Sequence, residues 1–271
     1  MVWKIVSLVV LAALAVGSWV FIFVDRNRAV PADNYSYSAP ATPSVSTTSA
    51  SGSPSPSAAA TPTGSTTPAA AAKITLPEDA KVVMIGDSWT SGYAAEPRTD
   101  GFAYLTADSM GWDLTNLGAA GTGYVNAGPN DEGDFADRIA NREQDDDIDL
   151  VIIQGGLSDA SSEDADEVTA GATRAITAAR TTWPKAQLVI LGPCPSRLPA
   201  PSPLTSVDSQ LTALTSTRKI NYLSCLKQNW INSSNYDEVI DADSSYRPST
   251  EGHAYLAKQL EAGLRKIVVT G

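Results

Sequence analysis

Basic residues, histidine and cysteine are all scarce in this sequence. Its 271 residues include 19 Lys and Arg against 30 Asp and Glu, which gives a formal net charge of −11 and a single histidine. No basic patch offsets this charge, which argues against nucleic acid or an anionic membrane surface as a partner. The two cysteines, Cys194 and Cys225, have no neighbouring Cys or His at metal-ligand spacing. We therefore expect no metal and no cofactor.

The two cysteines allow only one intramolecular pairing. Structural disulfides are typical of exported domains and rare in cytosolic ones. We expect a Cys194–Cys225 disulfide and an oxidising compartment, with two buried free thiols as the alternative.

Charge is also missing from the N-terminal segment. Residues 5–24 form a run of 20 uncharged, mostly apolar residues, long enough to cross about 30 Å of hydrocarbon as a helix. This run exceeds the apolar core of a signal peptide, which is about 7–15 residues long. We expect an uncleaved transmembrane anchor within residues 1–28; a cleaved signal, which would release a secreted domain, is the alternative.

A second uncharged stretch follows the apolar run. Residues 34–72 carry no charge and consist mainly of Ser, Thr, Pro and Ala. Such a composition cannot bury enough apolar surface to offset chain entropy, so we expect a disordered linker over residues 29–75. Anchor and linker together predict a single-pass protein of the cell membrane, with residues 76–271 as an extracytoplasmic domain.

Within residues 76–271, strand and helix signals alternate. Strands are predicted at 82–86, 112–117, 149–154, 187–191 and 238–240, and helices at 102–110, 135–142, 163–183, in part of 207–230, and around 256–267. Continuous apolar strands separated by helices are typical of a parallel sheet that is covered on both faces. We expect an α/β fold, a three-layer α/β/α sandwich with a five-stranded parallel sheet of flavodoxin-like type.

The most informative stretch is Lys81–Gly92, KVVMIGDSWTSG. Its Gly-Asp-Ser follows the strand at 82–86 and places Ser88 at the carboxyl edge of the sheet, where open α/β folds bind ligands. Ser88 could also merely cap the next helix. The segment GDSWTSG resembles block I of the SGNH (GDSL-type) hydrolases, a family of esterases with an α/β/α sandwich fold. This resemblance implies that Ser88 is the nucleophile.

Two later stretches resemble further blocks of the same family. Residues 116–124, NLGAAGTGY, are similar to block II, which implies that Gly121 lends its N–H to the oxyanion hole. Residues 154–159, QGGLSD, stand at block III, which is usually Gly-x-Asn-Asp. Ser158 therefore occupies the position of the family's asparagine, another oxyanion donor, and keeps a hydroxyl there.

The last block departs from the family pattern. The family usually has Asp-x-x-His-Pro followed by Gly-His, whereas here Ser244 stands at the aspartate position and Arg247 at the histidine position. Pro248 and Gly252-His253 remain in register. A guanidinium has a pKa above about 12 and cannot accept the proton of a serine hydroxyl. The replacement therefore predicts impaired or lost hydrolysis.

Few side chains offer a substitute base. His253, the only histidine, corresponds to the family's second, non-catalytic histidine, and we expect it to pack or hydrogen-bond rather than to serve as a recruited base. Asp241 and Asp243 are further alternatives, although they are more naturally solvated loop residues.

Four residues are assigned to ligand binding: Asp87, Trp89, Tyr124 and Arg247. Trp89 and Tyr124 would flank Ser88 and could stack on a sugar ring, or they could belong to the edge of the core. Arg247 would place a fixed positive charge near Ser88, unless it points outward and pairs with Glu251 or an acidic loop.

The resemblance implies an esterase-like protein of the cell envelope whose partner is an envelope glycan or an acylated or anionic small ligand. Because the aspartate and histidine positions have changed, we expect binding with feeble or no hydrolysis. The alternative is an active serine esterase or O-deacetylase with a rearranged base.

Overall fold

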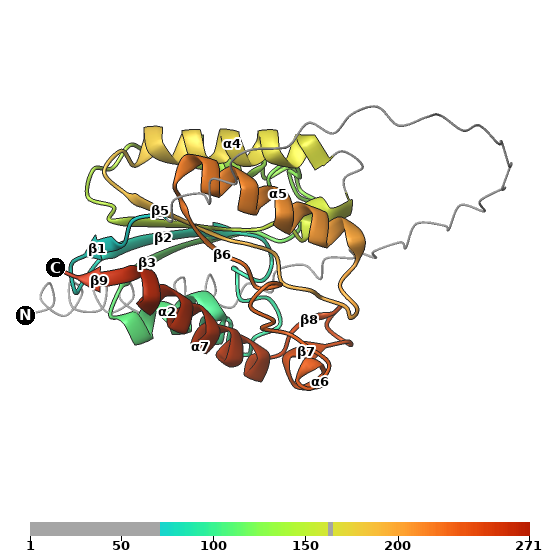
Figure 1. Ribbon diagram of the computed structural model, residues 1–271. Helices are drawn as coiled ribbons and strands as arrows, with labels where there is room; N and C mark the ends of the chain where they lie inside the picture. The colour runs from blue at the N-terminus through green and yellow to red at the C-terminus, as the bar shows by residue number, and fades with distance from the viewer. Residues whose placement is uncertain (1–70, 162–164) are drawn as a thin grey trace, which may run out of the picture. The chain divides into compact units, whose positions relative to one another are not determined.

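The computed structural model of the chain describes residues 71–161 and 165–271 (Figure 1). The predicted anchor and nearly all of the predicted linker lie outside these residues. Within the described part of the chain, no helix is long and apolar enough to span a membrane.

Five parallel strands form the central sheet, in the spatial order β3-β2-β4-β5-β6. They are β2 (Lys81–Gly86), β3 (Asp113–Gly118), β4 (Leu150–Gln154), β5 (Gln187–Leu191) and β6 (Asn221–Leu223). From β2 the chain moves first to one side, to β3, and then to the other, to β4 and β5. This reversal makes the carboxyl end of β2 the switch point of the sheet, the usual position of a ligand crevice.

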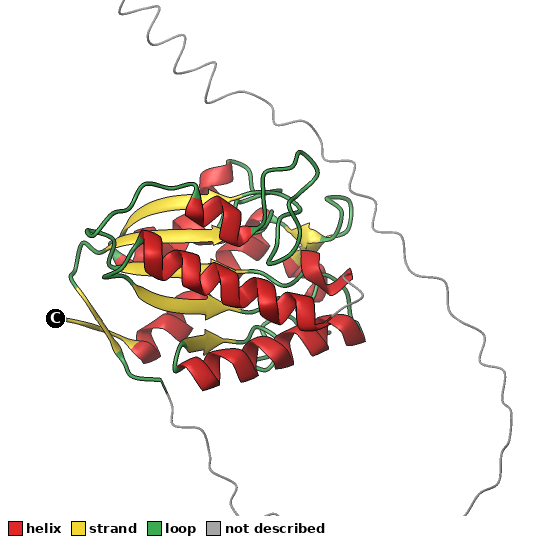
Figure 2. Cartoon of the chain, turned by 90° about the horizontal axis from the view of Figure 1, so that it is seen from above, coloured by secondary structure: helices red, strands yellow, loops and turns green. Residues whose placement is uncertain are grey.

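Helices cover both faces of the sheet, which confirms the predicted sandwich (Figures 1 and 2). On one face lie α3 (Phe135–Ala140), α4 (Ala165–Thr182) and α5 (Ser202–Arg218); on the other lie α2 (Phe102–Met110) and α7 (Thr250–Ile267). Successive strand residues point to opposite faces. Val82 and Met84 of β2 accordingly pack with α2 and α7, whereas Val83 and Ile85 pack in the second core with α3 and α4.

The fifth strand is not the one that the sequence predicted. Residues 238–240 were expected to join the sheet, but Tyr236–Val239 form the short helix α6, and Ile240–Asp241 form β7, which pairs with β8 (Arg247–Pro248) outside the sheet. The true fifth strand, β6, lies inside the segment 207–230 that was predicted to be partly helical. Helix α5 ends there because Lys219 adopts a left-handed conformation with a φ of 55°.

Four further elements complete the domain: β1 (Ile74–Leu76), β9 (Val268–Thr270), which pairs with β1, and the 3-10 turns η1 (Arg98–Asp100) and η2 (Ser158–Ser161). Strand β1 begins within the last residues of the predicted linker.

The predicted Cys194–Cys225 disulfide is present, with its Cα atoms 5.1 Å apart. It joins the loops after β5 and β6, so Cys225 follows a strand rather than lying in a helix.

Candidate active site

Ser88 lies in the turn that directly follows β2, and its side chain is 7% exposed. The preceding Gly86 is required by close packing, because a Cβ there would lie 2.2 Å from Thr90 Oγ1 and 2.7 Å from Gln154 Oε1. The turn is closed by backbone bonds from Ser91 N to Asp87 O and from Tyr93 N to Ser88 O, at 3.1 and 3.0 Å. The serine is thus held at the switch point in a tightly fixed backbone.

Asp87 lies under this turn and is 1% exposed. Its Oδ1 accepts a hydrogen bond from Trp89 N at 2.8 Å, and its Oδ2 accepts one from Gln154 Nε2 at 3.3 Å. Gln154 in turn accepts the hydroxyl of Thr90 at 2.6 Å. Burial raises the pKa of Asp87 to about 6. Because both carboxylate oxygens are bonded to the protein, Asp87 ties β2 to β4 and does not present itself to a ligand.

Arg247 reaches Ser88 from β8. Its Nε donates to Ser88 Oγ at 3.3 Å, and Nη1 donates to the backbone oxygen of Ser244 at 3.4 Å. The guanidinium carbon lies 4.3 Å from the centroid of the Tyr93 ring, a cation–π arrangement. Arg247 is only 9% exposed, so it points inward, and the alternative of an outward pair with Glu251 is wrong.

His253 is fully buried and both of its ring nitrogens are occupied. Nδ1 accepts from Phe102 N at 3.2 Å, which leaves the proton on Nε2 to be donated to Tyr93 O at 3.0 Å. Burial lowers the pKa of His253, and its ring stacks on Phe102 with centroids 6.0 Å apart. The histidine therefore fastens α7 to the segments that follow Ser88 and is not aimed at the serine hydroxyl.

The carboxylates near Arg247 are also directed elsewhere. Asp241 Oδ2 accepts from Ser244 Oγ at 2.5 Å, and Oδ1 accepts from Asp243 N at 2.9 Å. The hydrogen bond from Ser244 holds the pKa of Asp241 below its usual range. Ser88 Oγ accepts a hydrogen bond from Arg247 Nε, whereas His253 and Asp241 are bonded to other groups.

The two predicted oxyanion positions follow the strands on either side of β2. Gly121 lies in the loop after β3 with a φ of 73°, and the same loop is fastened to β2 by the bond from Ala119 N to Gly86 O at 3.0 Å. Ser158 begins η2 after β4, and its backbone oxygen accepts from Asn126 Nδ2 at 2.9 Å. The topology therefore brings Ser88, Gly121 and Ser158 to one edge of the sheet.

Asp159 joins the two outer loops of this edge. It is fully buried and accepts hydrogen bonds from Tyr124 N and Val125 N, each at 3.0 Å. Burial raises the pKa of Asp159. These bonds fix the loop that carries Gly121 relative to the turn that carries Ser158.

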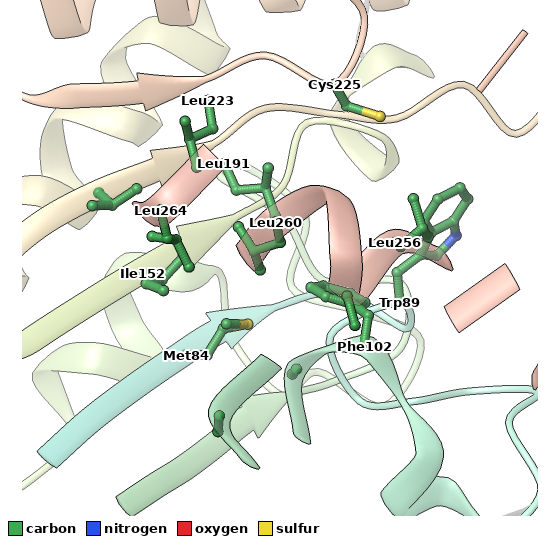
Figure 3. Close-up of a cluster of buried hydrophobic side chains, with 14 of the residues drawn as sticks. Met84, Trp89, Phe102, Ile152, Leu191, Leu223, Cys225, Leu256, Leu260 and Leu264 are labelled. Atoms are coloured by element: carbon green, nitrogen blue, oxygen red, sulfur yellow. The ribbon is translucent and has the colours of Figure 1, made fainter. Parts of the chain in front are cut away.

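The two predicted sugar-stacking aromatics belong to the core. Trp89 is 3% exposed and packs in the cluster with Phe102 and Leu256 (Figure 3). Tyr124 is fully buried and meets the Phe135 ring edge-on, with centroids 5.1 Å apart. Neither ring offers a face to a ligand, so their assignment to ligand binding is corrected.

The sequence analysis missed Tyr93 and Gln154, which hold Arg247 and Asp87 in place. Gln154 had a signal, since it is the polar residue that ends the buried run of β4. Tyr93 had none, because nothing in the sequence indicates that its ring meets a residue 154 positions later.

Comparison with known proteins now identifies the family. The chain matches the sequence profile of the GDSL-like lipase/acylhydrolase family over residues 84–255, more than half of its length. The protein therefore belongs to this family. No curated protein matches the sequence.

Solved structures of esterases share the fold at low sequence identity. An aryl esterase from M. smegmatis superposes with a TM-score of 0.51 at 17% identity, covering 69% of this chain and 99% of the other. A family two carbohydrate esterase from Cellvibrio japonicus gives 0.55 at 20% identity, covering 71% of this chain and 62% of the other. One from Clostridium thermocellum, in complex with cellohexaose, gives 0.52 at 18% identity and covers 70% and 65%.

Proposed function

We propose that this protein is a membrane-anchored, extracytoplasmic GDSL-family member that binds an acylated or anionic ligand, with little or no ester hydrolysis. The observation that supports this most directly is the hydrogen bond from Arg247 Nε to Ser88 Oγ at 3.3 Å. The guanidinium stands where a general base would be needed.

Hydrolysis through Ser88 requires a group that takes the hydroxyl proton as the oxygen attacks. Arginine stays protonated and can only donate hydrogen bonds. Arg247 therefore donates a hydrogen bond to Ser88 Oγ, which makes this oxygen a weaker nucleophile instead of a stronger one. General-base catalysis contributes on the order of 10²–10⁴-fold, so its loss makes hydrolysis slow.

The same groups suit an anion. A carboxylate or phosphate oxygen would accept from the Ser88 hydroxyl, from the Gly121 N–H and from the Arg247 guanidinium, and such charge-assisted bonds are among the strongest hydrogen bonds. Ser88 and Arg247 are 7% and 9% exposed. Only a small group of the ligand can reach them, which favours an oxyanion attached to a larger molecule.

Three observations support a cell-envelope glycan as the larger molecule. Carbohydrate esterases share the fold, and one of them is in complex with cellohexaose. The apolar run at 5–24 and the uncharged Ser/Thr/Pro linker suit a domain tethered outside a membrane. The Cys194–Cys225 disulfide suits an oxidising compartment. A mature N-terminus located after Val24 would replace the anchor by a cleaved signal.

Retention of Ser88 in its fixed turn favours one alternative, an active esterase or O-deacetylase with a rearranged base. Galacturonate and phosphate binding, measured by calorimetry, and hydrolysis of p-nitrophenyl acetate separate the two. We expect Arg247→Ala to weaken anion binding by about 1.5–3 kcal/mol, whereas Arg180→Ala, on the surface of α4, changes nothing. Turnover near an ordinary enzyme rate of about 10 s⁻¹ that is lost in Ser88→Ala would show an esterase instead.

A further inference from the structure

Arginine and tyrosine side chains alternate in the loops around Ser88. Arg247 lies over the Tyr93 ring, at 4.3 Å from its centroid, and Arg98 approaches the same ring at 5.4 Å. Arg197 lies over Tyr246, the neighbour of Arg247 in the chain, at 3.5 Å. We call Arg98, Arg247 and Arg197 the arginine row. The Tyr93 ring joins Arg98 and Arg247 directly, and Arg197 is placed beside them because its ring partner, Tyr246, directly precedes Arg247 in the chain.

No ion pair of the described residues engages the arginine row. In the described part of the chain no carboxylate lies within ion-pair distance of its three guanidinium groups, whereas Arg174, Arg265 and three lysines are all paired. Arg98 and Arg197 are exposed. In a chain of net charge −11, these three cations are a local concentration of positive charge. An anionic ligand could pair with all three of them.

The Arg197 end of the row opens on a cavity of about 420 Å³. Its lining consists of two tyrosines, two charged residues and two others: Tyr236, Tyr246, Arg197, Asp237, Leu198 and Ser233. The hydroxyl of Tyr236 donates to Ser196 O at 2.7 Å, which fixes that ring. Aromatic faces beside a few charged groups suit a sugar unit, whose C–H faces stack on rings and whose hydroxyls bond to Asp237 and Arg197.

We infer that the arginine row binds an anionic oligosaccharide, a glycan whose successive units carry carboxylate or phosphate groups. One anionic group occupies the position at Ser88 and Arg247, and the neighbouring units extend past Tyr246 into the cavity beside Arg197. This inference rests on the proposed function for its Arg247 end and adds the class and length of the ligand. A nucleic acid fits less well, because its dense charge of about one per 1.7 Å of duplex meets a protein of net charge −11.

Ligand length provides the test. Calorimetry on the full-length protein in detergent compares galacturonate, hexagalacturonate and neutral cellohexaose. We expect hexagalacturonate to bind at least tenfold more tightly than the monomer and cellohexaose to bind more weakly than either. Arg98→Gln and Arg197→Gln should each lower hexamer affinity about fivefold to tenfold and leave monomer binding unchanged. Arg180→Gln is the matched control, because Arg180 is exposed on α4, without an ion-pair partner and distant in sequence from the row.

The outcomes separate this inference from the proposed function. If galacturonate binds through Arg247 but the hexamer gains nothing, or if Arg180→Gln weakens the hexamer as much as the row variants do, the arginine row is not a glycan site and the anion receptor stands. If neither monomer nor hexamer binds, both this inference and the proposed function fail.

A glycerol-phosphate hexamer that competes with hexagalacturonate supports a phosphate-bearing glycan, and one that does not compete supports a carboxylate-bearing glycan. Oligothymidylate that binds as tightly as either would overturn the glycan assignment.

Discussion

Two segments meet at the candidate site: the turn after β2, residues 86–92, and the segment from β8 into α7, residues 247–253. In the first, the Gly-Asp-Ser motif resembles the family pattern, and the hydrogen bonds of Asp87 fix the turn. In the second, we expect the residues that build the fold to follow the pattern, and we propose that Ser244 and Arg247 stand at the two positions that would supply the base. The comparison separates what the fold requires from what hydrolysis requires.

The start of α7 shows how strongly the fold constrains the second segment. Ser249 caps the helix by accepting from Gly252 N at 2.9 Å. Gly252 lies against α6, so that a Cβ would lie 2.0 Å from Val239 O. His253 bonds to two backbone groups. Arg247, by contrast, directs its side chain to Ser88, Ser244 and Tyr93 at the site. The first three residues therefore persist for structural reasons even if hydrolysis has been lost.

The largest effect that we predict is a gain in hydrolysis when the family pattern is restored. The triple variant Ser158→Asn, Ser244→Asp and Arg247→His returns the aspartate, the histidine and the oxyanion donor to their family positions. We expect p-nitrophenyl acetate hydrolysis to rise by about 10²–10⁴-fold over the natural chain, the usual contribution of a positioned base.

Adding Ser88→Ala to the triple variant is the control and should remove the gain. A triple variant with the same unfolding temperature as the natural protein but no faster hydrolysis would contradict the assignment of these positions. Should the triple variant fail to fold, Arg247→His alone provides the comparison.

A substitution at Gly252 tests whether the start of α7 is constrained by the fold. We expect Gly252→Ala to destabilise the domain by about 3 kcal/mol, the upper end of the usual cost of overpacking, because its methyl group would collide with the backbone oxygen of Val239, which cannot move without shifting α6. Gly263→Ala lies in the same helix, but its methyl group would meet the side chain of Leu223 at 3.2 Å.

That control should cost little or even stabilise, since alanine favours a helix by about 1 kcal/mol over glycine. Urea unfolding followed by tryptophan fluorescence measures both variants. Equal midpoints for the two would show that the start of α7 is not constrained as described.

How far the sequence predicted the fold depends on the length of each element. The apolar runs of β2, β4 and β5 and the apolar stripe of α7 are long enough to identify by their pattern. Strand β6 has three residues, two of them half-buried, and it follows a helix that ends at a lysine instead of the usual glycine. No local signal separates it from the helix, because its pairing with β5 alone defines it as a strand.

The same distinction applies to the site. Ser88, Gly121 and Ser158 follow strand ends, so the order of strands was enough to bring them to one edge. Burial of Trp89 and Tyr124 could not be predicted, because an aromatic residue beside a strand end can face either the core or the solvent. The sequence placed Arg247 at the histidine position, but only the structure shows that Tyr93 stacks against its guanidinium and holds it inward.

The smallest effect we predict concerns the buried Asp87 under Ser88 and the dependence of stability on pH. Burial raises the pKa of Asp87 from 3.8 to about 6. Between these two values the folded protein binds more protons than the unfolded chain, so the free energy of unfolding falls as pH rises from about 4 to 6 and is level above that. Asp87→Asn removes this dependence.

The variant should therefore gain about 2–3 kcal/mol relative to the natural protein between pH 4 and pH 6, because one pKa unit corresponds to about 1.4 kcal/mol. Asp159 also has a pKa raised by burial and adds a slope of the same sign in both proteins, and because the two carboxylates repel each other, removing Asp87 also reduces the slope from Asp159. Urea midpoints measured at intervals across this range give the two curves. If stability changes with pH in the same way in both proteins, Asp87 titrates in the folded protein as it does in the unfolded chain. Its carboxyl group would then be more hydrated than its burial indicates.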